Sequence, residues 1–320
     1  MNKFAVVLAY ALLAVAADVS AEAADSLPVW AYPVNPPGIK PAPDDGALKH
    51  VPNSSAAFTL TQLRDLFSPP DWYPDSHPSM PDVVGRGNKP GQFACGFCHL
   101  PNGLGRPENS SLAGLPASYI AQQVADFKSG ARKSSEPASL PINLMVAVAK
   151  LVSEEDVNIA AQYFASLKPA PWIRVVETDT VPKTKVGGWM LIADGSGGTE
   201  AIGQRIIEMP ENLERTELRD SASGFIAYVP MGSMRKGEAL ITNGAGKTTP
   251  CAICHGADLK GLGPVPALAG RSPSYIVRQL YDIQHGVRNG QWTELMKSVV
   301  ARLSAEDLVA IAAYTASLAP

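Results

Sequence analysis

The chain has 320 residues, a formal net charge of −3 at pH 7 and 46% hydrophobic residues. This length and apolar content are enough for two domains of ordinary size. The small negative charge, without a long basic run, argues against nucleic acid or an anionic membrane surface as the principal partner. With 28 prolines and 27 glycines, the chain is expected to contain much irregular backbone.

The N-terminus has the pattern of a secretion signal. Met1-Asn2-Lys3 is a short basic start, and an apolar run follows from Phe4 to Ala17. Small residues suited to cleavage lie at Ala21-Glu22-Ala23, with Val19-Ser20-Ala21 as a competitor. The run is too short for a membrane span, and no later stretch approaches about 20 continuous apolar residues. We expect a signal peptide over residues 1–23, a periplasmic protein, and no transmembrane segment in the mature chain.

Residues 24–79 form a proline-rich segment, which we call the arm. One short helix is expected within it, from Ala57 to Phe67, and the remainder is interpreted as chain that wraps around the rest of the protein. His50 and His77 lie in proline-rich loops of the arm, and both are expected to be ordinary surface residues.

Residues 80–169, the first module, contain the motif Cys95-Gly96-Phe97-Cys98-His99. Downstream, bulky residues from Tyr119 to Phe127 recur at helical spacing and predict a helix. Ser153, with Asp156 three positions later, has the pattern of an N-cap, which satisfies free amide donors at a helix start. A last helix is therefore expected from this serine to the proline at position 169.

Residues 170–231, the connector, have a different pattern. Four strand-like runs, at 172–177, 188–192, 205–209 and 224–229, predict a small β-rich unit with a glycine-rich turn at 194–198. The connector contains no His or Cys. We interpret it as a spacer that fixes the flanking parts relative to one another, with a partner-docking surface as the alternative.

Residues 232–320, the second module, repeat the first. Cys251-Ala252-Ile253-Cys254-His255 follows the first motif by 156 positions, and Leu-Ala-Gly and Ser-Tyr-Ile recur at the same offset. Beyond Arg132 the offset falls by five, which places an insertion around residues 134–141 of the first copy. Met145 then aligns with Met296. The repeat predicts an all-α fold class with two modules in tandem, joined by the β-rich connector.

Both Cys-x-x-Cys-His motifs indicate covalently bound haem c. The two thiols form thioether bonds to the porphyrin, and the following histidine supplies the proximal nitrogen ligand. A disulfide redox pair would need a βαβ context, and a zinc site would need more ligands than each module offers. We therefore expect two haem c groups. They are attached through Cys95, Cys98, Cys251 and Cys254, and His99 and His255 bind the two irons.

The second axial ligand follows by elimination. Met145 is the only methionine between His99 and Pro169, where no second His or Cys occurs. In the second module Met296 is the only methionine after His255, and His285 is its one competitor. We predict Met145 and Met296 as the ligands. His–Met ligation raises the haem potential and leaves the iron six-coordinate, which suits electron transfer.

These features resemble the tandem diheme class I cytochromes c of the cytochrome c4 type. The shared pattern is Cys-x-x-Cys-His, Leu-Ala-Gly, Ser-Tyr-Ile, Gly-x-Arg, and a methionine before a Ser-x-x-Asp helix start, over residues 80–169 and 232–320. The resemblance implies two small all-α domains that relay electrons. The implied donor is a quinol-oxidising complex or a dehydrogenase, and the acceptor an oxidase, a reductase or another cytochrome. The arm and the connector make this chain larger than such a carrier.

Two details concern the surroundings of the haems. The resemblance implies that Pro266, before Leu-Ala-Gly, orients His255 through its carbonyl, and Ser110 stands at that place in the first module. Arg132 and Arg288, with Tyr119 and Tyr275, are candidates for contacts to haem propionates; the alternative is surface arginines and core tyrosines.

The sequence thus predicts a periplasmic electron carrier with no catalytic residue of its own. Two alternatives stay open. One is the electron-accepting subunit of a periplasmic dehydrogenase. The other is a diheme enzyme, such as a peroxidase or a thiosulfate-oxidising cytochrome, which needs an open axial position at one haem.

Overall fold

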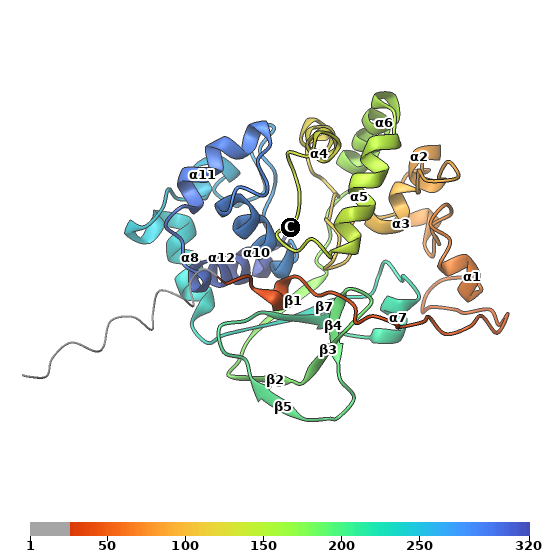
Figure 1. Ribbon diagram of the computed structural model, residues 1–320, viewed down its shortest axis with the longest axis horizontal. Coiled ribbons are helices and arrows are strands. Elements are labelled where there is room, and N and C mark those ends of the chain that lie inside the picture. The colour runs from red at the N-terminus through yellow and green to blue at the C-terminus, as the bar shows by residue number, and fades with distance from the viewer. Residues whose placement is uncertain (1–25) are drawn as a thin grey trace, which may run out of the picture.

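The computed structural model describes residues 26–320, and the expected signal peptide lies outside them. Two groups of helices lie side by side above the strands in Figure 1. The arm, drawn in red and orange, runs from beside the second group, beneath the helices, to the outer side of the first (Figure 1).

The first group contains the helices that precede the strands. They are α1 (Leu60–Leu63), α2 (Asp82–Gly85), α3 (Cys95–His99), α4 (Ala117–Ser129), α5 (Leu140–Leu151) and α6 (Glu154–Ser166). The helix expected over 57–67 is only the four-residue α1, which begins at a capping box of Thr59 and Gln62. It ends early because the Asp65 carboxylate accepts a hydrogen bond from the Phe67 backbone N–H at 2.9 Å, which holds the chain in a turn.

The second group follows the strands, apart from α7, which belongs to the connector. Its helices are α8 (Ser233–Asn243), α9 (Ala252–His255), α10 (Pro273–Gln284), α11 (Glu294–Val300) and α12 (Ala305–Ser317). Helices α8 and α12 cross at Gly237, where a Cβ atom would lie 2.1 Å from the Ala310 carbonyl oxygen. Close helix packing therefore requires glycine there. The two groups differ in the helix that precedes the attachment motif. In the first group it is α2, a single turn, and in the second group it is α8, with eleven residues.

Both predicted helix starts are confirmed. The Ser153 hydroxyl accepts from the Asp156 N–H at 3.0 Å at the start of α6. At the start of α12, Ser304 accepts from the Asp307 N–H, and the Asp307 carboxylate accepts from the Ser304 N–H at 2.9 Å. Asp307 thus completes a capping box in the second module only.

All the strands of the described residues lie between positions 173 and 229. They are β1 (Ile173–Glu177), β2 (Thr180–Pro182), β3 (Thr184–Gly187), β4 (Met190–Ala193), β5 (Thr199–Ala201), β6 (Ile207–Pro210) and β7 (Phe225–Val229), with α7 (Leu213–Glu217) between the last two. Strand β7 is central in a three-stranded sheet, parallel to β1 and antiparallel to β6. The pairs β2–β5 and β3–β4 are antiparallel hairpin-like ribbons.

The connector packs against the cores of both modules. Trp172 and Phe225 belong to the buried cluster of the first module, and their rings meet edge to face at 5.4 Å. Ala227 and Val229 are buried in the cluster of the second module. Strand β7 therefore contributes to both hydrophobic cores, which supports the spacer interpretation.

The arm joins the second module to the first. The Tyr32 hydroxyl donates to Asp282 Oδ1 at 2.7 Å. Arg278, on α10, donates to the carbonyl oxygens of Ala31 in the arm and Pro107 in the first module. Although Ala31 and Tyr32 precede the first module in sequence, they are therefore part of the second core.

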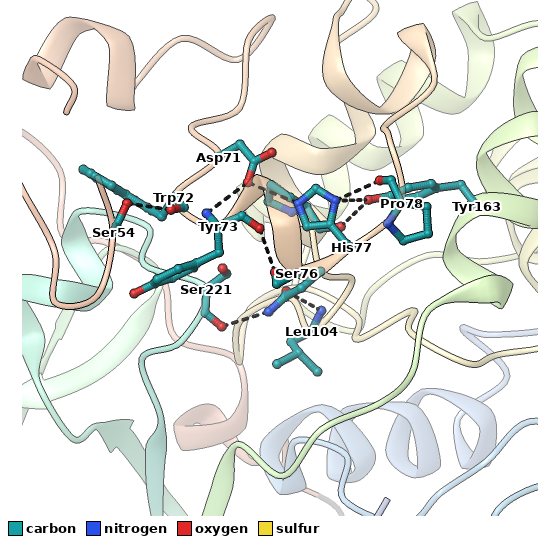
Figure 2. A network of polar contacts seen from close by, with 12 residues as sticks. Ser54, Asp71, Trp72, Tyr73, Ser76, His77, Pro78, Leu104, Tyr163 and Ser221 are labelled. Atoms are coloured by element: carbon teal, nitrogen blue, oxygen red, sulfur yellow. Dashed lines mark hydrogen bonds and ion pairs between the residues drawn. The ribbon is translucent and has the colours of Figure 1, made fainter. Parts of the chain in front are cut away.

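The other end of the arm is held by a polar network around His77 (Figure 2). His77 Nε2 lies 3.1 Å from Asp71 Oδ1, and Nδ1 lies 2.9 Å from the Pro78 carbonyl oxygen and 3.1 Å from the Tyr163 hydroxyl. The His77 side chain is only 4% exposed. The expectation that His77 is a surface residue is therefore wrong: its ring is enclosed because it ties the arm to α6. His50 is exposed, as expected.

Candidate functional site

The first Cys-x-x-Cys-His motif forms helix α3 beside an apolar cavity. The cavity wall contains Cys95, Cys98 and His99 together with Met145 from α5. Most of the other lining side chains are apolar; they include Ile120, Val124, Phe127, Val148, Val157 and Phe164. Two thiols, an imidazole and a thioether around an apolar cavity are the donor set that a covalently attached haem requires. The residues present therefore fit the group.

His99 is oriented through its other ring nitrogen. Its Nδ1 lies 2.8 Å from the Ser110 carbonyl oxygen, which can only accept, so Nδ1 carries the proton. The lone pair is then on Nε2, the nitrogen left to bind a metal. Burial lowers the pKa of His99, which favours the neutral imidazole that ligation needs. Phe164 packs edge to face on the ring at 6.0 Å.

The surroundings of the cysteines do not suit disulfide exchange. Burial, with a smaller contribution from neighbouring Cys98, raises the pKa of the Cys95 thiol to about 12, and burial raises that of Cys251 to about 11. Redox-active cysteines have thiol pKa values lowered to neutral pH or below. The disulfide redox interpretation of the motifs is therefore disfavoured.

The second motif repeats this geometry. His255 is buried, and its Nδ1 lies 2.8 Å from the Pro266 carbonyl oxygen, which fixes the same tautomer. The expected orienting role of the Pro266 carbonyl is thus confirmed, and the Ser110 carbonyl has the same role in the first module. Serine can replace proline here because the acceptor is a backbone atom. Met296 is half-buried against the second core, as is Cys251, whereas Cys254 is exposed.

The competitor of Met296 is placed differently. His285 lies at the C-terminal end of α10, where its Nδ1 is 2.9 Å from the Tyr281 carbonyl oxygen. Its ring stacks on Tyr281 with centroids 3.9 Å apart. His285 is exposed, while Met296 packs on the core that contains Leu308 and Ile311.

The two modules meet through a symmetric polar network. Arg132 Nη2 donates to the Tyr275 hydroxyl at 2.9 Å and to Gln279 Oε1 at 2.7 Å. The equivalent Arg288 Nη2 donates to Tyr119 at 2.9 Å and to Gln123 Oε1 at 2.8 Å. Each donor and its partners are separated from their counterparts by 156 positions. The alternative of isolated surface arginines is therefore wrong.

The interface also forms one wall of the first cavity. Tyr275, Arg278 and Gln279 of the second module line it together with Arg132 and Tyr119 of the first. Burial opposes ionisation of Tyr275, but Arg132 and Arg288 together outweigh it and lower the pKa of Tyr275 to about 8. The site beside the first motif thus ends in cationic groups at the module boundary.

Sequence reasoning missed several residues around the first motif. Phe164 lies within the predicted last helix of the first module, and neither Phe164 nor Arg278 belongs to a recognisable motif. Arg219 of the connector donates to the Phe97 carbonyl, and its guanidinium lies 3.7 Å from the Phe97 ring centroid. No sequence signal marks Arg219, because the connector is outside the repeat.

Comparisons with known proteins agree with this site. The family model "Cytochrome C oxidase, cbb3-type, subunit III" matches residues 233–314. A thiosulfate dehydrogenase electron acceptor of Thiomonas intermedia is 27% identical over 71% of this chain and 80% of its own. Cytochrome c4 of Azotobacter vinelandii is 25% identical over 70% of this chain and 84% of its own. Cytochrome c-554(548) of Halomonas halodenitrificans is 39% identical over 23% of this chain and 90% of its own.

Among solved structures, reduced recombinant cytochrome c4 from Pseudomonas stutzeri covers 70% of this chain and 93% of its own, with 22% identity and a TM-score of 0.46.

The attachment motifs and these relatives define a c-type cytochrome, a protein that transfers electrons on covalently bound haem c. The chain belongs to the c-type cytochromes, and it is similar over most of its length to the tandem diheme proteins of the cytochrome c4 type. Within residues 26–320, no helix combines the length and the apolar character that a bilayer span demands.

Proposed function

We propose that the protein carries two haem c groups and passes single electrons between redox proteins in the periplasm. Cys95 and Cys98 attach the first haem, and His99 and Met145 bind its iron. Cys251 and Cys254 attach the second, with His255 and Met296 as the iron ligands. Residues 80–169 and 232–320 are the two haem domains; the arm, residues 24–79, and the connector, residues 170–231, hold them together.

The observation that carries this proposal is the shared wall of the first cavity. Tyr275 and Gln279 belong to the second module, yet they line the cavity beside the first haem motif. A haem held at Cys95 and Cys98 is therefore adjacent to the module that holds the other. This arrangement suits electron exchange inside the protein.

The haem supplies reversible one-electron chemistry when it is bound. The chain's own residues hold it and limit what else reaches the iron. His99 and His255 are fixed in one tautomer by the Ser110 and Pro266 carbonyls. Met145 and Met296 would each supply a thioether ligand, and the apolar wall around the first motif would limit the access of water, which together would suit electron transfer over substrate chemistry.

A carrier is supported over a peroxidase by the residues around the cavity. Its wall contains one histidine, His99, which is the ligand. His50 and His285 are exposed, and His77 is enclosed by Asp71, Pro78 and Tyr163. None of these three lines the cavity, so none is placed to act as a base beside the first iron.

One relative favours a more specific role. The Thiomonas protein is named as the electron acceptor of a thiosulfate dehydrogenase, and most of its length is covered. The second candidate function is therefore an electron acceptor for a periplasmic dehydrogenase, in which this chain performs no substrate chemistry.

The test is the absorption spectrum of the oxidised holoprotein, with the weak methionine-sulfur-to-iron band quantified per haem. We expect two haems per chain, and we expect Met145→Ala and Met296→Ala each to remove half of the band. A wild-type haem that is high-spin, or that binds carbon monoxide readily when reduced, would contradict the ligand assignment at that haem and favour an enzyme.

A further inference from the structure

Helices α3 and α9, which carry the two attachment motifs, occupy the same place in the repeat but differ in how far other residues shield them from solvent. Phe97, inside the first motif, is 9% exposed, whereas the equivalent Ile253 is 64% exposed. The following loop shows the same contrast, with Arg106 at 7% and Leu262 at 61%. Since the local backbone is repeated, the difference comes from what packs on each helix.

The connector supplies the cover on the first module. Arg219, just after α7, places its guanidinium 3.7 Å from the Phe97 ring centroid and donates to the Phe97 carbonyl. Nearby, Asn102 donates to the Ser221 carbonyl at 2.9 Å. This turn is held by an ion pair between Arg215 and Asp220 at 2.6 Å.

Arg219 also brings a net charge to this helix. The neighbouring Arg106 and Glu108 form their own buried pair at 3.0 Å, so their charges largely cancel. Within residues 26–320, Arg219 Nε has no hydrogen-bond partner. Burial lowers the pKa of the Arg219 guanidinium to about 10, which leaves it protonated at neutral pH. A fixed cation thus lies against the helix that carries Cys98.

We propose that Arg219 raises the reduction potential of the haem on Cys95 and Cys98 above that of the haem on Cys251 and Cys254. The inference rests on the proposed two-haem function. Reduction adds an electron to the haem, so a buried positive charge stabilises the reduced state, and the effect is stronger where water is excluded. In the second module the equivalent Ile253 is exposed, so among the described residues no buried arginine covers that attachment helix as Arg219 covers the first. An electron at equilibrium therefore resides mainly in the first module.

The experiment is a spectroelectrochemical titration of the full-length holoprotein. Met296→His serves as the background, because replacing methionine lowers the potential of the second haem and separates the two titrations. In this background Arg219→Gln is expected to shift the reduction equilibrium of the first haem about tenfold toward the oxidised form, which is about 59 mV for one electron. Arg219→Lys keeps the charge and is expected to retain most of the wild-type value.

The controls separate charge from structure. Arg174→Gln also removes a cation from the connector, but Arg174 is 61% exposed and thus far less buried than Arg219. This variant is expected to leave both potentials unchanged. Equal shifts in the Gln and Lys variants would show a structural effect and overturn the proposal, as would no shift in Arg219→Gln.

A second measurement does not depend on the folding of any Arg219 variant. Comparing the wild type with Met296→His assigns the two wild-type potentials, and the first haem is expected to be the higher. A lower value at the first haem would overturn the inference. Failure of the two-haem function is distinguishable, because a haem determination would then give one haem per chain.

Discussion

Arg132 and Arg288 stand at the same position of the two repeats, and each donates hydrogen bonds to the tyrosine and the glutamine of the opposite module. The two chain segments also pair through the backbone at these residues. The interface is therefore built from the repeated residues themselves, and each module supplies both donor and acceptor.

Removal of one arginine should weaken the interface measurably. Arg132→Ala removes the charged donor of the Tyr275 hydroxyl and one of the two charged donors of Gln279 Oε1, which keeps only Arg288 Nη1 at 3.1 Å. Hydrogen bonds to charged groups contribute about 1.5–3 kcal/mol each. We expect a loss of about 2 kcal/mol in the free energy of unfolding by urea. Arg174→Ala, which removes an exposed ion pair to Glu211, is the control and should cost no more than about 0.5 kcal/mol. Equal losses of unfolding free energy in the two variants would show that the buried network stabilises the protein no more than an exposed ion pair does.

The crossing of α8 and α12 gives a steric prediction. In Gly237→Ala the new methyl group meets the Ala310 carbonyl oxygen and the Tyr314 Cβ, so the helices must separate. We expect destabilisation of about 3 kcal/mol or more, although alanine is the better helix former by about 1 kcal/mol. Glu238→Ala, at the next and exposed position, should be nearly neutral. Thermal unfolding followed by circular dichroism measures both, and an unchanged melting temperature in Gly237→Ala would refute the close crossing.

Asp307 predicts a difference between the modules at low pH. Burial would raise the pKa of its carboxyl, but Lys247, Lys236 and the Ser304 cap together lower it to about 2. Because the folded pKa lies below the ordinary 3.8, the stabilisation is present above pH 3.8 and is lost as the pH falls toward 2. Asp307→Asn should remove about 2 kcal/mol at neutral pH and flatten the loss between pH 4 and 2.

Asp156 provides the matched control for that prediction. It is the equivalent residue of the first module, but it has no lysine partners like those of Asp307 among the contacts of the described residues. Asp156→Asn should therefore cost well under half as much in the same acid titration of thermal stability. A similar cost for both variants would mean that the cap alone, rather than the two lysines, determines the effect.

The enclosed His77 predicts loosening of the arm at alkaline pH. Both ring nitrogens face acceptors, the Asp71 carboxylate and the Pro78 carbonyl, so both can donate when the ring is protonated. The hydrogen bond to Asp71 raises the pKa of His77, despite burial, and the resulting stabilisation is complete below pH 6.5. It is lost as the pH rises through the raised value.

Hydrogen exchange of the amides around residues 71–78 measures this effect. After correction for intrinsic rates, protection in the wild type should be constant below pH 6.5 and should fall as the pH rises above it. His77→Gln should lack the change, and His50→Gln, at an exposed position, should retain it. A pH-independent protection in the wild type would contradict the ionised pair.

Much of the site was predictable because its chemistry is local. The attachment motifs place two cysteines and a histidine within five residues, and elimination pointed to Met145, which lines the same cavity. Iron ligation by Met145 and Met296 stays a prediction. The helix starts at Ser153 and Ser304 were predictable for the same reason, since a cap depends on neighbours three positions away.

Contacts between distant segments were not predictable in this way. His77 was assigned to the surface because proline-rich loops are usually exposed, but its partner Tyr163 lies 86 positions later. Arg219 meets Phe97 across 122 positions and belongs to no repeat. The short strands β2, β3 and β5 were missed because three or four residues carry too little alternation to be distinguished from loop.

The arm reverses the usual order of folding along the chain. Tyr32 is synthesised before either module, but its partners Arg278 and Asp282 are made about 250 residues later. The segment around Tyr32 can therefore be buried only after the segment that contains Arg278 and Asp282 has been synthesised. A polypeptide interrupted after the first module would lack the core in which Ala31 and Tyr32 are buried, so these apolar side chains would have no surface to pack against.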